Sequence, residues 1–290
     1  MRLIGLYREA EYSPGRHRSN DARLIEMVAE SLGARGVLVD LLTLDDAAAA
    51  RRSAAMVFSM CQGRAALDTL ARWDLEGTRI VNSPRAALNT YRDRLPAVMR
   101  SANLAFPETT LVPTRGGIGS IAGHGPGGVW LKRGDVHASV AADVQWVDSA
   151  AGLHAGLAEF ASRGITHAAL QPHRVGDEIK FYGVAGGEFF HWFFSGDQTH
   201  PSTGSQRAEP DPAALQRLAE DAAAAAGLEI FGGDVIVGPS GQLTVIDLND
   251  WPSFAPCRDR AADAIAGYLM RQVDAAWNPG LVSSAKQGAL

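Results

Sequence analysis

Two short runs rich in β-branched residues, joined by a turn, constrain the fold of this chain more than any other stretch. The runs are residues 233–237 (GDVIV) and 243–248 (LTVIDL), and the sequence GPSG follows the first of them. This pattern predicts a β-hairpin. Side chains two apart on a strand share a face, so Asp247 and Asn249 lie together and Asp234 can lie beside them. The hairpin therefore gathers oxygen-bearing side chains at one edge of a sheet.

Oxygen ligands of this kind suit a hard cation such as Mg²⁺, which keeps several waters and also binds substrate phosphates. Asp234, Asp247 and Asn249 are therefore candidate metal ligands. The alternative is a surface hairpin whose polar ends are hydrated, and the Asp-x-Asn spacing taken alone favours this alternative. From the hairpin alone, we expect Asp247→Asn to leave the stability of the ligand-free protein unchanged or higher, because it relieves repulsion between the two carboxylates.

The composition is that of a soluble globular protein. Of the 290 residues, 46% are hydrophobic and 20% are charged, and the formal net charge is −5. The chain has no basic stripe that would indicate nucleic acid and no run of about 18 apolar residues that would indicate a membrane span. Cys61 and Cys257 lack metal-like spacing and fit free thiols in a reducing compartment. Because the N-terminal apolar run is too short for a signal peptide, we expect a cytoplasmic protein.

Strands alternate with helices over the first 82 residues. Apolar runs predict strands at 2–7, 37–41, 54–60 and 78–82, and helical spacing predicts helices at 21–32 and 67–73, with a loop at 9–20. This alternation favours a parallel α/β sheet. A glycine-rich fingerprint does not follow the first strand, so a dinucleotide-binding fold is not supported.

Helices and strands also follow one another in the remainder. Helices are expected from residue 84 and at 93–102, 150–163, 212–226 and 260–277, and strands at 129–132, 144–147, 166–173, 176–184 and 188–194. The polar stretch 195–212 predicts a long loop that could cover a substrate.

The hairpin and the residues that follow it resemble the C-terminal strand pair of the ATP-grasp superfamily. That family carries a glycine–acid strand, a turn, and an acid-x-Asn motif followed by Pro, which match Gly233-Asp234, Asp247-Leu248-Asn249 and Pro252. The family usually has Glu where Asp247 stands. It often has Pro-Gly after the Asn, where this chain has Asp250-Trp251.

Further segments extend the resemblance over residues 82–252. An Asn-Ser-Pro entry leads to Asp93-Arg94, where the family has Asp-Lys, and Lys132 ends a strand as a family lysine does. The resemblance implies that the residues around ATP are Arg94, Lys132, His137, Gln171, Pro172, His173, Arg174 and Glu178. Among these, Arg94 could instead be a helix-surface residue, and His137 an ordinary loop histidine.

The resemblance also implies the fold class and its division. It implies an α/β protein with an ATP-grasp fold, in which an N-terminal parallel α/β domain (1–82) precedes two α+β subdomains (83–165 and 166–290) that clasp ATP. It implies ATP as cofactor, together with Mg²⁺ or Mn²⁺ on the candidate metal ligands.

The implied reaction is an ATP-dependent ligation of a small carboxylate, such as an amino acid, to an amine through an acyl phosphate. Positive charges and the metal must offset the repulsion between a carboxylate and the γ-phosphate, and Lys132, Arg94 and Lys180 can supply them. The catalytic candidates are Lys180 and Arg258, of which Arg258 could hold the substrate carboxylate. Arg258 could equally form a surface ion pair. Small-molecule acids and amines are the expected partners, without nucleic acid or membrane, and homo-oligomer formation stays open. An ATP-grasp kinase acting on a hydroxyl and a non-catalytic nucleotide-binding protein are the alternatives.

Overall fold

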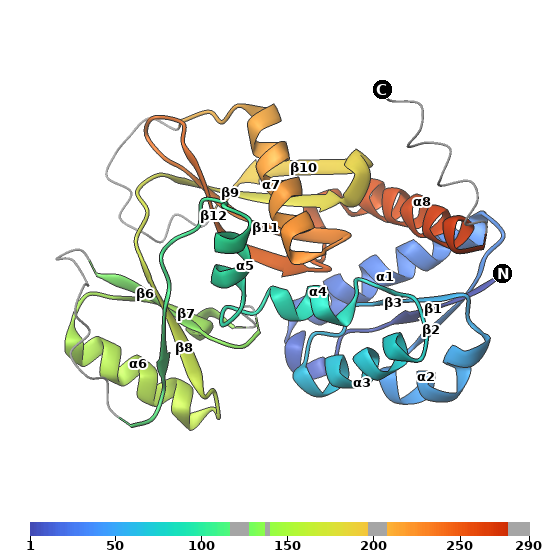
Figure 1. The fold of residues 1–290 in the computed structure, drawn as a ribbon, viewed down its shortest axis with the longest axis horizontal. Coiled ribbons are helices and arrows are strands. Elements are labelled where there is room, and N and C mark those ends of the chain that lie inside the picture. Colours follow the sequence, from blue (N-terminus) through green and yellow to red (C-terminus); the bar gives the residue numbers. More distant parts are fainter. Residues whose placement is uncertain (117–127, 137–139, 197–207, 278–290) are drawn as a thin grey trace. The chain divides into compact units, whose positions relative to one another are not determined.

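The computed structural model describes residues 1–116, 128–136, 140–196 and 208–277 (Figure 1). Over these residues the chain forms two compact units. The first unit comprises Met1–Pro84, Val184–Phe189 and Trp251–Leu290, and the second comprises Arg85–Gly183 and Phe190–Asp250. Among the described helices, none combines the length and the apolar character needed to cross a membrane. How the chain divides into independently folding domains stays a prediction.

The first unit is built on a parallel sheet with the strand order β2-β1-β3-β4. Its strands are β1 (Arg2–Leu6), β2 (Leu38–Leu42), β3 (Met56–Ser59) and β4 (Ile80–Val81). Figure 1 shows α1 (Arg16–Ala34) on one face, with α2 (Leu44–Ala50) and α3 (Arg64–Leu75) on the other, as right-handed crossovers in this strand order require. α8 (Arg258–Trp277) packs against α1. The expected parallel α/β arrangement is confirmed.

The expected loop at 9–20 was wrong in its second half, because α1 begins at Arg16. The first helical turns are polar and carry no apolar period, which hid them from a pattern search. The loop that remains is held by Ser13, whose hydroxyl donates to the buried carboxylate of Asp21 at 2.6 Å, and it includes the short 3-10 helix Ala10–Tyr12. The helix thereby starts within a polar segment that a buried hydrogen bond anchors.

The second unit contains an antiparallel sheet with the strand order β5-β8-β6-β7. The strands are β5 (Thr110–Pro113), β6 (Val129–Arg133), β7 (Val144–Val147) and β8 (His167–Pro172), and α6 (Ala150–Ser162) covers one face (Figure 1). The core beneath α6 includes Leu131, Leu157 and Phe160. Because strand side chains alternate, Trp130 and Lys132 project from the opposite face of β6.

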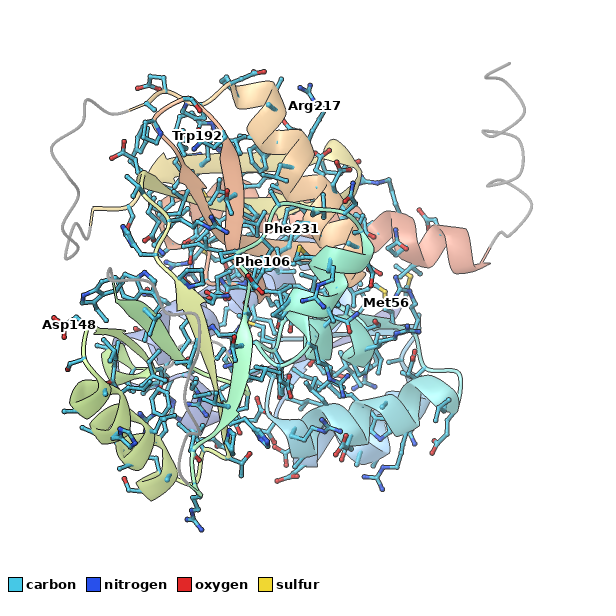
Figure 2. The ribbon with its side chains drawn as sticks, turned by 60° about the vertical axis from the view of Figure 1, so that its left-hand side comes forward. Met56, Phe106, Asp148, Trp192, Arg217 and Phe231 are labelled. Carbon is cyan, nitrogen blue, oxygen red and sulfur yellow. The ribbon has the colours of Figure 1, made fainter. Side chains whose placement is uncertain are left out.

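A further sheet of the second unit has the strand order β10-β9-β11-β12. Its strands are β9 (Asp177–Val184), β10 (Phe189–Phe194), β11 (Ile230–Val237) and β12 (Leu243–Asp250). The helices α5 (Leu95–Ser101) and α7 (Pro212–Ala226) supply its core, and α4 (Pro84–Asn89) precedes them. Phe231 lies in that core, and Phe106 and Trp192 pack against it (Figure 2).

The hairpin expected at 233–248 is confirmed, and so is the strand pair around Gly186-Gly187. Both ends of α7 are capped. Asp211 caps the first turn by accepting from the Ala213 amide at 3.0 Å, and Gly227 ends the helix with φ +81°. Most of the expected loop at 195–212 lies outside the described residues.

Candidate active site

Charged side chains from both sheets of the second unit meet at the faces that turn away from their helices. Lys132 projects from β6 with 6% of its surface exposed, and its ammonium donates to the main-chain oxygen of Ile246 on β12 at 3.3 Å. This contact joins the sheets directly. It also places a buried cation beside the strand that carries Asp247.

Arg92 lies between α4 and α5 and is almost fully buried, with 3% of its surface exposed. Its guanidinium forms an ion pair with Asp247 and also donates to the main-chain oxygen of Val136 at 3.4 Å. The neighbouring amide of Asp93 donates to the main-chain oxygen of Gly134 at 2.9 Å. Arg92 therefore links β12 to the loop that follows Lys132.

Lys180 on β9 forms ion pairs with Asp234 on β11, at 2.9 Å, and with Glu178, at 3.2 Å. Asp234 and Asp247 lie directly opposite each other in the antiparallel pairing of β11 with β12, next to a β-bulge. The bulge adds a residue to one strand and re-aims the side chains beside it. We refer to Lys132, Arg92, Asp247, Lys180, Asp234 and Glu178 together as the charged cluster.

The pKa values within the charged cluster follow from burial and from its neighbouring charges. Burial lowers the pKa of Lys132 to about 8, and the carboxylate of Asp247 offsets only part of this effect. Burial also opposes ionisation of Lys180, but Asp234 and Glu178 outweigh it and raise the pKa of that ammonium above its ordinary value. Burial raises the pKa of Asp234 despite its contact with Lys180. Lys132 is thus a cation whose burial outweighs the carboxylates near it.

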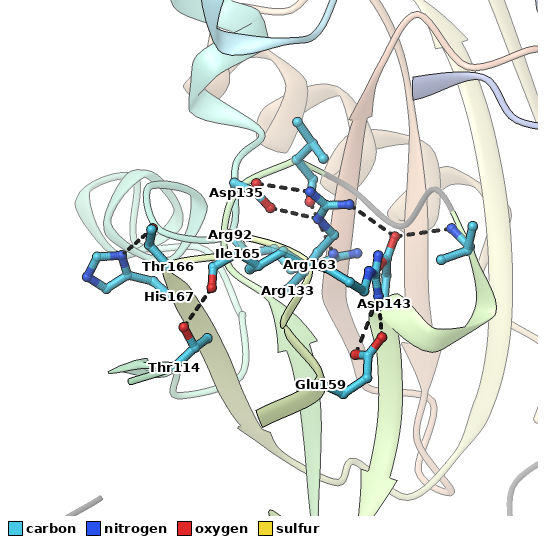
Figure 3. Close-up of polar contacts among 12 residues, drawn as sticks. Arg92, Thr114, Arg133, Asp135, Asp143, Glu159, Arg163, Ile165, Thr166 and His167 are labelled. Atoms are coloured by element: carbon cyan, nitrogen blue, oxygen red, sulfur yellow. Dashed lines mark hydrogen bonds and ion pairs between the residues drawn. The ribbon is translucent and has the colours of Figure 1, made fainter. Parts of the chain in front are cut away.

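An ion-pair network fixes the loop that follows Lys132 (Figure 3). The carboxylate of Asp143 is fully buried and pairs with Arg163 and, at 3.4 Å, with Arg133. It also accepts from the amide of Val140 at 3.1 Å, while Arg133 pairs with Asp135 at 2.7 Å. Both ends of the loop are therefore anchored. Its residues 137–139, including the predicted ligand His137, lie outside the described residues.

The remaining predicted nucleotide contacts lie around the end of β8. Gln171 is buried and its amide donates to the hydroxyl of Thr109 at 3.0 Å, and the ring of His173 accepts from Trp130 at 3.3 Å. Pro172 and Arg174 are exposed in the same segment. Trp130 lies opposite Gln171 in the pairing of β6 with β8, so this segment borders the sheet face that carries Trp130 and Lys132.

The remaining predicted residues have different surroundings. Arg94 caps α5 and is half-buried. Asn249 is half-buried on β12, two residues after Asp247. Arg258 belongs to the first unit, where its guanidinium donates to the side chain of Asn20 at 3.0 Å. Sequence reasoning missed Arg92, although it stands two residues before Arg94 and could have been weighed as a second basic candidate.

Asp234 and Asp247 are the candidate metal ligands, and the donor groups around them determine which metal they fit. Among the described residues, no group of His, Cys, Asp and Glu side chains has three members close enough to hold a metal ion. Two facing carboxylates with a neighbouring amide oxygen do fit Mg²⁺ that is shared with nucleotide phosphates, since Mg²⁺ in such sites uses one or two carboxylates and retains waters. The residues fit a metal that arrives with the nucleotide.

The first unit has a cavity of about 730 Å³ at the carboxyl ends of its parallel strands. Two of the charged side chains at this cavity, Arg8 and Glu9, already have partners. Arg8 pairs with Asp21 at 3.6 Å and donates to the main-chain oxygen of Trp251 at 2.6 Å, and Glu9 accepts from the amides of Gln62 and Gly63 at 3.1 and 3.0 Å. These contacts hold the loop after β1 in place.

Comparison with solved structures places this architecture. No protein-family model matches the sequence, and no curated protein matches it by sequence. The D-alanine–D-alanine ligase of Bacillus anthracis, solved in complex with ATP, is similar with a TM-score of 0.69 and 12% identity, over 94% of this chain and 99% of that chain. The RimK domain ATP-grasp protein of Sphaerobacter thermophilus gives a TM-score of 0.66 and 18% identity, over 93% and 100%.

The chain has the ATP-grasp fold. The ATP-grasp ligase PsnB, solved with a minimal precursor, agrees with this at a TM-score of 0.58 and 17% identity, over 93% of this chain and 98% of that chain. The predicted fold class is confirmed, and so is the resemblance on which it rested. Within the ATP-grasp fold, the charged cluster lies between the sheets that carry β6 and β12.

Proposed function

We propose that this protein is an ATP-dependent ligase that joins a small carboxylate to an amine through an acyl phosphate. The observation that carries the proposal is the charged cluster, in which cations from β6, β9 and the α4–α5 segment lie beside carboxylates on β11 and β12. Similar structures include ligases, one of them solved with ATP. ATP is therefore the proposed cofactor, with Mg²⁺ held by Asp234 and Asp247 and completed by Asn249.

Each cation has a proposed role in that reaction. Lys132 would bind the ATP phosphates, because nearby carboxylates offset the burial of its ammonium only in part, so an anionic ligand would stabilise its charge further. Arg92 would fix the metal ligand Asp247 relative to Val136, in the loop that follows Lys132. Lys180 would receive the substrate carboxylate, so that two anions can approach each other.

The chemistry needs no covalent enzyme intermediate. A carboxylate oxygen attacks the γ-phosphorus and ADP leaves, which yields an acyl phosphate; the amine then attacks the acyl carbon and phosphate leaves with one of the former carboxylate oxygens. Mg²⁺, when bound, supplies charge neutralisation on the phosphates. Positioning and electrostatic stabilisation account for the rest, as in other phosphoryl transfers.

Isotope transfer provides the decisive experiment. With a carboxylate pool labelled with ¹⁸O, an amine pool and Mg²⁺-ATP, the released phosphate should carry ¹⁸O, and ADP should accumulate only when acid and amine are both present. Lys132→Met should abolish the reaction, while Arg100→Gln, on the exposed surface of α5, should not change it. ADP formed with hydroxyl compounds alone would indicate a kinase. ATP binding without ADP for any acceptor would indicate a binding protein.

A further inference from the structure

The face of β9 that carries Lys180 continues into a group of aromatic side chains. Along β9, Ile179 and Phe181 point into the core with α7, so Glu178, Lys180 and Tyr182 share the opposite face. These residues are half-buried, in contrast to the fully buried Ile179 and Phe181. Tyr182 therefore stands one side-chain spacing, about 7 Å, from Lys180 on the exposed face of the strand.

The neighbouring edge strand β10 adds aromatic rings to the same face. Phe190, Trp192 and Phe194 pack against the core, which leaves His191 and Phe193 on the other side. The ring of Phe193 lies 5.9 Å from that of Tyr182 and 6.0 Å from that of His191, measured between centroids. We call Tyr182, His191 and Phe193 the aromatic surface.

Strand register places the aromatic surface next to Lys180 on the same face of the sheet, while Asp234 on β11 pairs with Lys180 from the other side. The amide of Ser195 donates to the main-chain oxygen of Glu178 at 2.9 Å, which sets the antiparallel alignment of β10 with β9. Two residues along, Phe193 falls opposite Lys180, and His191 falls opposite Tyr182. A carboxylate held by Lys180 therefore lies on the sheet face that carries Phe193.

We propose that the aromatic surface binds a ring-bearing side chain of the carboxylate substrate, so that the protein prefers aromatic acids to aliphatic ones. This inference rests on the proposed function, because Lys180 receives the carboxylate there. Aromatic rings favour offset or edge-to-face contact with another ring, and the Tyr182 and His191 rings also bring polar atoms for a substituted ring. An amine in the same position would meet the like charge of Lys180, which favours the acid as the occupant.

Acid selectivity of two Phe193 variants tests the inference. ADP release is measured with ATP, Mg²⁺, an amine pool and matched acids, for example phenylalanine against alanine and phenylacetate against acetate. We expect kcat/KM of the wild type to favour the ring-bearing acid by at least about tenfold. Phe193→Ala and Phe193→Leu should remove this preference, because they should lower kcat/KM for the ring-bearing acids much more than for the aliphatic ones. Trp192→Phe, on the opposite face of β10, should keep the preference and serves as the control.

Several outcomes would overturn the inference. Equal turnover of ring-bearing and aliphatic acids by the wild type would do so, as would an equal loss for both in the Phe193 variants. A preference that follows the amine would assign the surface to the other substrate. Calorimetry of the same acids with a non-hydrolysable ATP analogue separates this inference from the proposed function. Ring-selective binding that depends on Phe193 but gives no ADP refutes only the ligase, whereas turnover without ring selectivity refutes only the aromatic surface. Neither binding nor turnover refutes both.

Discussion

Replacing Lys132 with methionine should make the ligand-free protein more stable at pH 7 and at the same time remove its affinity for ATP. The ammonium is buried between β6 and β12, where desolvation disfavours its charge more than Asp247 favours it. Methionine has a similar length and fills the same space without a charge. The structure thus places a destabilising charge where the proposed function requires one.

The expected gain can be worked from the pKa of Lys132. It falls from 10.5 to about 8 on folding, which corresponds to a cost of about 3 kcal/mol at neutral pH. The variant also loses the hydrogen bond to Ile246, worth about 1 kcal/mol, so a net gain of about 2 kcal/mol remains.

This gain should depend on pH in a defined direction. Because the folded-state pKa lies below the unfolded value, the unfolded chain binds more protons between pH 8 and 10.5, and the stability of the wild type rises across that window. The variant lacks this rise. Its advantage should therefore be full below pH 8, shrink as the pH increases, and end as a deficit of about 1 kcal/mol above the window.

Urea unfolding of both proteins at pH 7.0, 8.5 and 9.5 measures the difference, and calorimetry with ATP measures the affinity. Arg100→Met is the matched control, since it removes an exposed cation from α5 and should leave both quantities unchanged. A Lys132→Met protein that is less stable at pH 7, or whose stability difference does not vary with pH, would refute the reasoning. Unchanged ATP affinity would remove Lys132 from the proposed site.

Other predictions concern the remaining charges. Asp143→Ala should lower the free energy of unfolding in urea by about 3 kcal/mol. It would leave the guanidinium groups of Arg133 and Arg163 without their buried carboxylate partner. Asp247→Asn should cost about 1 kcal/mol, measured in the same way without ligand, because its amide accepts from Arg92 more weakly than a carboxylate does; a gain in stability would show that repulsion dominates instead. ATP affinity in calorimetry should fall above pH 8, where Lys132 loses its proton, and a flat profile would contradict this assignment.

Most of the fold could be predicted from local patterns in the sequence. The hairpin of β11 and β12 follows from β-branched runs around GPSG, and α7 follows from its apolar period between Asp211 and Gly227. The start of α1 escaped because its first turns are polar. α2 has a capping Thr43 and an alanine-rich sequence, but it is only seven residues long and shows little period. Short or polar helices depend on context that periodicity does not capture.

Most contacts of the candidate site join residues that are far apart in the sequence, and the sequence alone could not predict which residues pair. The segment before α5 is joined to the loop after β6 through Asp93 and Gly134, which turns Arg92 toward β12. Spacing along the chain identifies a basic pair at 92 and 94, but not which of the two side chains meets a carboxylate 155 positions later. The packing of the segment before α5 against β6 and β12 determines that Arg92, and not Arg94, reaches Asp247.

The pairing of Arg92 with Asp247 also changes what the metal-ligand hypothesis requires. From the hairpin alone, Asp234 and Asp247 are two like charges in contact, and removing one should relieve repulsion. In the structure each carboxylate is already neutralised, Asp234 by Lys180 and Asp247 by Arg92. On the proposed function, binding of Mg²⁺-ATP would therefore replace the existing ion pairs. The metal would bind the carboxylates of Asp234 and Asp247, and Lys180 and Arg92 would then face the phosphates and the substrate acid. Mg²⁺ alone should bind weakly, because it would leave buried cations without partners.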